Sequence, residues 1–165
     1  MVGFSFILNR NFLIFLNKNV YTMNKFEQVN SILLIDDDES SNFLHSIFIN
    51  KLGLDIEINT ALNGQEGLDF IMNRGLERLS LPCMVMLDLR MPVKDGWDFM
   101  RMYEEQVPEE LKQQLAIVLV TVSDNPEDKE RAAANPHILD YAQKPLSDST
   151  FKKLIGKHFN LKETV

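Results

Sequence analysis

The chain reads MLDLRMPVKDG over residues 86–96, so that Asp88 ends an apolar run and a loop marked by Pro92 and Gly96 follows. The apolar run begins near Pro82, and its uninterrupted character predicts a strand buried on both faces of a sheet. An ionised carboxylate at the end of such a strand is costly unless another group compensates its charge. A lone aspartate would equally fit a turn or a helix cap, so the neighbouring runs decide its role.

Three further apolar runs end in polar side chains of complementary chemistry: acids, a hydroxyl and an amine. They are residues 32–35, followed by Asp36, Asp37 and Asp38; residues 117–120, followed by Thr121; and residues 138–143, followed by Lys144 and Pro145. The carboxyl ends of parallel strands line one crevice, which is where open α/β sheets bind their ligands. We therefore expect these side chains to converge on Asp88.

Strand and helix patterns alternate from Ser31 onward, which predicts an α/β fold with a parallel sheet covered by helices on both faces. The remaining strand, residues 55–60, is more polar and is expected at a sheet edge. The expected helices are residues 40–51, 63–73, 97–107, 125–135 and one that follows Pro145, with a further short turn in residues 109–115.

Apolar spacing also predicts which helix faces are buried. In residues 40–51 the expected buried face is Phe43, Leu44, Ile47 and Phe48; in residues 63–73 it is Leu68, Ile71 and Met72; after Pro145 it is Phe151, Leu154, Ile155 and Phe159. The helix at residues 125–135 is expected to begin with Asn125 as cap and Pro126 in the first position. Ser147 or Asp148 is expected to cap the last helix.

Length and composition fit one ordinary globular domain, with 165 residues, 45% of them hydrophobic and 25% charged. The net charge is -7, and residues 1–22 hold two basic residues and no acid, so the remainder is more acidic still. An acidic body argues against a nucleic-acid surface as the main binding site. Cys83 is the single cysteine, which excludes an internal disulfide, fits a cytoplasmic protein and favours a core role for this thiol.

Residues 1–22 differ from the rest of the chain. Their apolar stretch is interrupted by Asn9, Arg10 and Asn11, and neither part approaches the ~20 residues of a membrane-spanning helix. The segment also lacks the charge pattern and cleavage site of a signal peptide. We expect residues 1–22 to lie outside the functional domain, with translation starting at Met23. The alternative is a short amphipathic segment that contacts a membrane or a partner.

Taken in chain order, the acids after residues 32–35, the Asp88 loop, Thr121 and Lys144-Pro145 resemble the receiver domain of two-component response regulators. The resemblance covers residues 31–160 and places a receiver domain within residues 23–165. It implies a doubly wound, five-stranded parallel sheet with strand order 2-1-3-4-5, as in flavodoxin-like and CheY-like proteins. Because no segment remains for an output domain, a stand-alone receiver is expected.

The resemblance implies that Asp88 is the nucleophile that takes a phosphoryl group from a phosphohistidine. The donor partner would be a sensor histidine kinase or a histidine phosphotransfer protein. It also implies a Mg2+ site formed by Asp36, Asp37, Asp88 and the backbone carbonyl of Arg90, oxygen ligands that suit this cation. Phosphoryl transfer requires positioning and charge neutralisation more than covalent help, which fits such a cation.

Lys144 and Thr121 would contact the phosphoryl oxygens, the first as a point charge and the second through its hydroxyl. By the same resemblance Tyr141 is a switch aromatic that moves inward as Thr121 shifts, and the Lys144-Pro145 bond is cis. The signal would leave through the helix at 125–135, the Tyr141 strand and the last helix, toward a downstream protein target. The protein would catalyse its own phosphorylation and dephosphorylation without being an enzyme in the usual sense.

Two other functions compete with this interpretation. Asp36 and Asp38 after a first strand, with Thr121 and Lys144 downstream, also resemble a phosphatase of the haloacid dehalogenase class, although Asp88 would then have no purpose. A binding module that kept the fold but lost phosphorylation is the other alternative. The histidines, His45, His137 and His158, lack a phosphodonor setting and are expected to be surface or packing residues.

Overall fold

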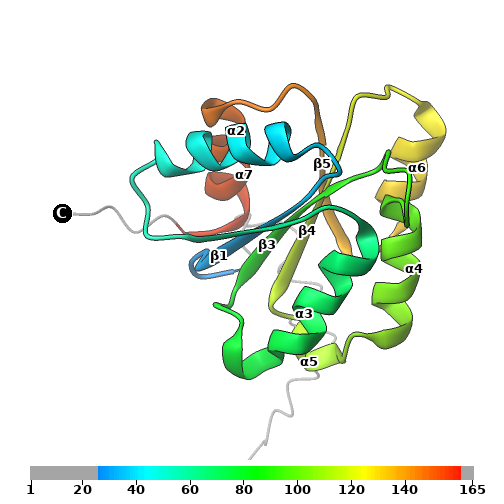
Figure 1. Ribbon diagram of the computed structural model, residues 1–165, viewed down its shortest axis with the longest axis horizontal. Coiled ribbons are helices and arrows are strands. Elements are labelled where there is room, and N and C mark those ends of the chain that lie inside the picture. The colour runs from blue at the N-terminus through cyan, green and yellow to red at the C-terminus, as the bar shows by residue number, and fades with distance from the viewer. Residues whose placement is uncertain (1–25, 161–165) are drawn as a thin grey trace, which may run out of the picture.

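The computed structural model describes residues 26–160, and within them five parallel strands form one sheet (Figure 1). The strands are β1 (Ser31–Ile35), β2 (Glu57–Ala61), β3 (Cys83–Asp88), β4 (Leu115–Thr121) and β5 (Ile138–Gln143). Their order across the sheet is β2-β1-β3-β4-β5, which confirms the predicted doubly wound α/β fold. The expectation that residues 1–22 stand apart from the domain lies outside the described residues.

Helices cover both faces of this sheet (Figure 1). One face is covered by α2 (Glu39–Asn50) and α7 (Asp148–His158), and the other by α3 (Gly64–Arg78), α4 (Gly96–Gln106), α5 (Glu109–Lys112) and α6 (Pro126–Ala134). Side chains alternate between the two faces along each strand, so the sheet separates two hydrophobic clusters. Every residue of β1, β3 and β4 is buried, whereas β2 is a polar edge strand as predicted.

Local signals placed most helix ends correctly. Asn125 caps α6 by accepting a hydrogen bond from the Glu127 N–H, with Pro126 in the first turn. Ser147 caps α7 and accepts from the Thr150 N–H. The Lys144-Pro145 peptide bond is cis, as the family resemblance implied. Cys83 is a core residue, and burial raises the pKa of its thiol to about 12.

The predicted buried face of α2 is wrong for three of its four residues, and only Phe48 is partly buried against the core. Phe43 is 70% exposed, Leu44 46% and Ile47 37%, and the residues that α2 buries are Asn42, His45 and Ile49. Asn42 faces inward because its amide donates to the Asp36 carbonyl at 2.9 Å. His45 turns inward too, edge-on to the Phe151 ring of α7. Polar contacts near the end of β1 thus set the rotation of α2 and leave its apolar residues outside.

The prediction for the second helix, residues 63–73, is wrong in one buried residue and in the position of the helix end. Leu68 and Ile71 are buried as expected, but Met72 is 41% exposed. The helix continues past residue 73 to Arg78, with a break at Gly75, whose φ of 54° is a left-handed value that glycine adopts without strain.

Candidate functional site

The carboxyl ends of four strands bring the predicted site residues to one edge of the sheet. Parallel register aligns Ile35 with Leu87 and Asp88 with Val120, so Asp36, Asp88 and Thr121 occupy adjacent strand ends. Lys144 follows β5, and its backbone N–H donates to the Thr121 carbonyl at 2.9 Å. Asp36, Asp88 and Thr121 are all buried, whereas Asp37 is exposed.

Lys144 joins the two buried acids directly. Its Nζ lies 2.6 Å from Asp36 Oδ2 and 2.9 Å from Asp88 Oδ2. Backbone donors use the other two carboxylate oxygens: the Asp38 N–H donates to Asp36 Oδ1, and the Arg90 N–H donates to Asp88 Oδ1 at 3.1 Å. The two buried carboxylates therefore share one ammonium, and each also accepts a hydrogen bond from one backbone amide.

The pKa values reflect this balance between burial and pairing. Burial raises the pKa of Asp88, and the hydrogen bonds from Lys144 and the Arg90 N–H offset only part of that effect. Burial alone would lower the pKa of Lys144, but its hydrogen bonds to Asp36 and Asp88 outweigh burial and raise it. Lys144 thus stays charged at neutral pH. The negative charge of ionised Asp88 is only partly compensated, so a further positive charge nearby would stabilise it.

Asp36, Asp37 and Asp88 form a cluster in which one carboxylate oxygen of each residue lies within 4.8 Å of the other two. Two such charges at about 4 Å repel by about 4 kcal/mol at an effective dielectric constant near 20. One Lys144 ammonium cannot neutralise three acids, so the oxygen donor set is compatible with a hard divalent cation.

Thr121 and Tyr141 meet at Ser123 and not at the acids. Thr121 Oγ1 accepts from the Ser123 N–H at 3.1 Å, and the Tyr141 hydroxyl donates to the Ser123 carbonyl at 3.0 Å. Within residues 26–160 no direct hydrogen bond joins Thr121 to Asp88. Ser123 thus contacts both members of the predicted switch pair.

Asp38 is separate from the acid cluster. Its carboxylate caps α2 by accepting from the Ser40 N–H at 2.9 Å and the Ser41 hydroxyl at 2.8 Å. These hydrogen bonds, that from Ser41 foremost, lower the pKa of Asp38. The haloacid dehalogenase alternative requires Asp38 in the reaction, but in this structure the Asp38 carboxylate caps the N-terminus of α2.

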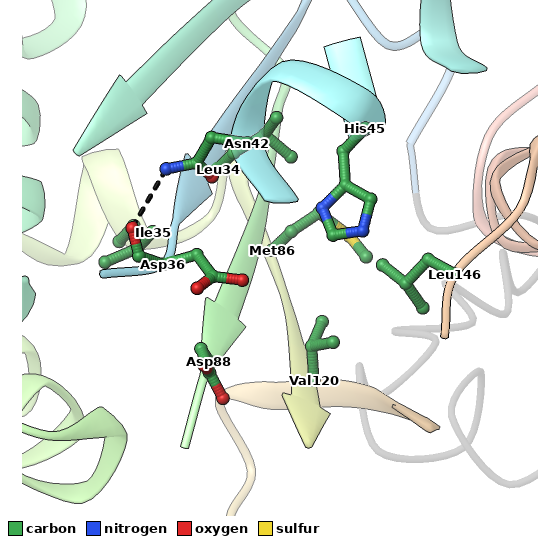
Figure 2. A pocket seen from close by; sticks show the side chains of 9 residues that line it. All are labelled: Leu34, Ile35, Asp36, Asn42, His45, Met86, Asp88, Val120 and Leu146. Carbon is green, nitrogen blue, oxygen red and sulfur yellow. Dashed lines mark hydrogen bonds between the residues drawn. The ribbon is translucent and has the colours of Figure 1, made fainter. Parts of the chain in front are cut away.

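A small cavity of about 10 Å³ lies beside Asp36 and Asp88, between the sheet and α2 (Figure 2). Its size matches about one water molecule. Asn42 and His45 line it, and burial lowers the pKa of His45, which favours its neutral form. Asn42 Oδ1 is buried without a hydrogen-bond partner among the described residues.

The apolar pattern of the sequence did not indicate this lining of the site. The available signal was the spacing of Asn42, His45 and Ile49 at i, i+3 and i+7, a helical stripe that the stronger apolar pattern of the opposite face obscured.

The fold and the site define an α/β domain with an acid and lysine cluster at the carboxyl edge of its sheet. The family model of the response regulator receiver domain matches residues 32–156. The chain belongs to this family.

Individual relatives agree with the family match. The probable methanogenesis regulatory protein FilR2 of Methanothrix harundinacea is 32% identical over 125 residues, which cover 75% of this chain and 77% of that protein. The probable C4-dicarboxylate response regulator DctR of Halalkalibacterium halodurans is 28% identical, and the match spans 47% of its length. A crystal structure of a two-component response regulator from Cytophaga hutchinsonii aligns with a TM-score of 0.68 and 26% identity, covering 79% of this chain and 97% of that chain.

The receiver domain family is not a family of conventional enzymes, and membership of it assigns the chain to two-component signalling. Within residues 26–160, every helix is too short or too polar to cross a bilayer.

Proposed function

We propose that this protein is a phosphoacceptor receiver that takes a phosphoryl group on Asp88 and thereby switches a protein-binding surface. The observation that carries the proposal is the bridge from Lys144 to both Asp36 and Asp88, with Asp37 within reach of the same point. We assign the receiver domain to residues 23–165, with its core at 31–160, and leave residues 1–22 outside it.

The proposed reaction transfers phosphoryl from nitrogen to oxygen. An Asp88 carboxylate oxygen attacks the phosphorus of a phosphohistidine, the new P–O bond forms, the P–N bond breaks, and its electron pair remains on the imidazole. Lys144 already contacts Asp88 Oδ2 and would hold a phosphoryl oxygen next to it. The Thr121 hydroxyl, released from the Ser123 N–H, would donate to another phosphoryl oxygen.

Asp36, Asp37, Asp88 and the Arg90 backbone carbonyl are the groups we propose as ligands of Mg2+. The cation would neutralise charge on the phosphoryl oxygens. The fit rests on the three clustered carboxylates, one of them exposed and open to entry, and on the Arg90 backbone held against Asp88.

The phosphoryl donor is proposed to be a sensor histidine kinase or a histidine phosphotransfer protein. The surface of this protein to which the donor docks would include the exposed apolar residues of α2, namely Phe43, Leu44 and Ile47. Grouped large apolar side chains are rare on a free surface and frequent in protein interfaces. The helix that carries them starts directly after Asp36, Asp37 and Asp38, so a partner seated there would lie beside the acid cluster.

The output surface is proposed to comprise α6, β5 with Tyr141, and α7, and to bind a downstream protein. Tyr141 is half-buried and held by the Ser123 carbonyl, next to Thr121. A shift of Thr121 toward a phosphoryl group would remove its contact with Ser123 and so change the anchor of Tyr141.

The test compares wild type with Asp88→Asn and Asp38→Asn, using acetyl phosphate and Mg2+. A receiver loses formation of the hydroxylamine-sensitive acyl phosphate in Asp88→Asn and keeps it in Asp38→Asn. A haloacid dehalogenase-like phosphatase would instead keep substrate turnover in Asp88→Asn and lose it in Asp38→Asn. A binding module without phosphorylation would form no acyl phosphate in any of the three proteins.

A further inference from the structure

Asp128 of α6 lies in a contact cluster outside the acid site. It is 9% exposed, and both of its carboxylate oxygens are occupied. Oδ2 accepts from an Arg90 guanidinium nitrogen at 3.0 Å, and Oδ1 accepts from the Trp97 indole N–H at 3.1 Å. The guanidinium of Arg131, also on α6, lies 3.9 Å from the centroid of the Trp97 ring. One carboxylate thus joins the loop after β3, the start of α4 and α6.

Arg90 connects this cluster to the proposed phosphorylation site. Its backbone N–H donates to Asp88 Oδ1, while its side chain reaches Asp128 on α6. The two ends of Arg90 therefore contact the phosphoacceptor and α6 respectively.

The position of α6 on the sheet depends strongly on the contact between Asp128 and Arg90, because the helix buries few apolar side chains. Its sequence, PEDKERAAA, buries only Asp128 and Ala132. A helix with so little apolar burial has few other contacts to hold it on the sheet, and such elements open most readily. If Arg90 were lost, the Asp128 carboxylate would stay largely buried. Its remaining hydrogen-bond donor in this cluster would be the neutral Trp97 indole N–H.

Resting on the proposed function above, we propose that Asp128 is a positioning residue that ties α6 to the Asp88 loop through Arg90, and that phosphorylation of Asp88 releases this tie. A phosphoryl group carries a charge of about -1.5 to -2 near neutral pH and binds guanidinium groups strongly. It would compete with Asp128 for Arg90, whose side chain is 59% exposed and can reorient in solvent. Once Asp128 loses Arg90, α6 loosens.

The test is amide hydrogen exchange of α6, measured with and without phosphorylation by acetyl phosphate and Mg2+. Without phosphate, Asp128→Asn and Arg90→Gln should each speed exchange in α6 about two- to fivefold, the effect of one partly exposed ion pair. Phosphorylation should speed exchange in wild-type α6 by a similar factor and add little in either variant. Arg90→Gln keeps the backbone groups beside Asp88.

Arg101→Gln is the matched control, because it breaks an ion pair within α4, between Arg101 and Asp98, whose arginine is about as exposed as Arg90. It should leave exchange in α6 and its response to phosphorylation unchanged. If Asp128 were only a stabilising residue, exchange would rise in Asp128→Asn but the response to phosphorylation would stay as in wild type, which would overturn the proposal. Failure of wild type to form the acyl phosphate, measured in the same samples, would instead overturn the proposed function and this inference with it.

Discussion

Asp88 is a buried acid whose charge the protein compensates only in part. Lys144 is shared between Asp88 and Asp36, and burial keeps the pKa of Asp88 above its ordinary value of 3.8. The folded protein thus binds a proton at Asp88 up to a higher pH than the unfolded chain does. Ionised Asp88 therefore costs stability at neutral pH, and this cost disappears below pH 3.8, where both states hold the proton.

Asp88→Asn should consequently stabilise the apoprotein. We expect the melting temperature in EDTA at pH 7 to rise by about 2–4 °C, the effect of roughly 1 kcal/mol in a domain of this size. The gain should shrink as the pH falls toward 4. Asp55→Asn, which removes an exposed carboxylate, serves as control and should leave the melting temperature unchanged. A lower melting temperature for Asp88→Asn at pH 7 would show that the Lys144 pairing outweighs burial.

Val122 is a branched residue directly after Thr121, at the carboxyl end of β4. Val122 is 67% exposed beside Thr121. We expect Val122→Ala to be phosphorylated a few-fold faster by acetyl phosphate, because the branched side chain narrows access to Asp88. Time courses of acyl phosphate formation provide the measurement. Equal rates in the two proteins would show that the Val122 side chain does not limit access to Asp88.

At the scale of elements, α2 shows the limit of helical periodicity as a guide to burial. Its sequence carries two stripes, an apolar one with Phe43, Leu44 and Ile47 and a mixed one with Asn42 and His45. Periodicity alone favours burial of the apolar stripe. The mixed stripe is buried because Asn42 donates to the Asp36 carbonyl and His45 packs on Phe151 of α7, contacts that apolar spacing does not reveal.

The exposed stripe of α2 gives a prediction that separates docking from chemistry. The double variant Phe43→Ser, Leu44→Ser should slow phosphotransfer from a phosphorylated histidine protein at least tenfold, since apolar anchors of an interface often contribute 1–2 kcal/mol or more each. Phosphorylation by acetyl phosphate should be unchanged, because the small donor needs no docking surface.

Met72→Ser, Leu76→Ser on α3 is the control, because it removes two apolar side chains of comparable exposure on the other face of the sheet. It should leave both reactions as they are in wild type. Equal loss with both donors in the α2 variant would point to damage of the site itself, and no loss with either donor would exclude α2 as the docking surface.

At the scale of the whole molecule, the sequence predicted the sheet because strand identity and strand ends are local features. Apolar runs mark β1, β3 and β4, and the polar residues that follow them fall on one edge of any parallel sheet. The grouping of Asp36, Asp88 and Lys144 followed from this rule and from the family resemblance. The Asp128 contact with Arg90 did not, because it joins residues 38 positions apart whose side chains meet only through the packing of α6 beside α4.

Site-specific reduction locates the phosphoryl group on the chain, and we expect to find it on Asp88. The full-length protein is incubated with a phosphorylated histidine kinase and Mg2+, then treated with borohydride, which reduces an aspartyl phosphate to homoserine. Peptide mass analysis should find homoserine at position 88 in the treated protein and unmodified aspartate at 36, 37 and 38. Two results would contradict phosphorylation of Asp88. One is homoserine at position 36 or 38 with Asp88 intact, and the other is transfer that persists in Asp88→Asn.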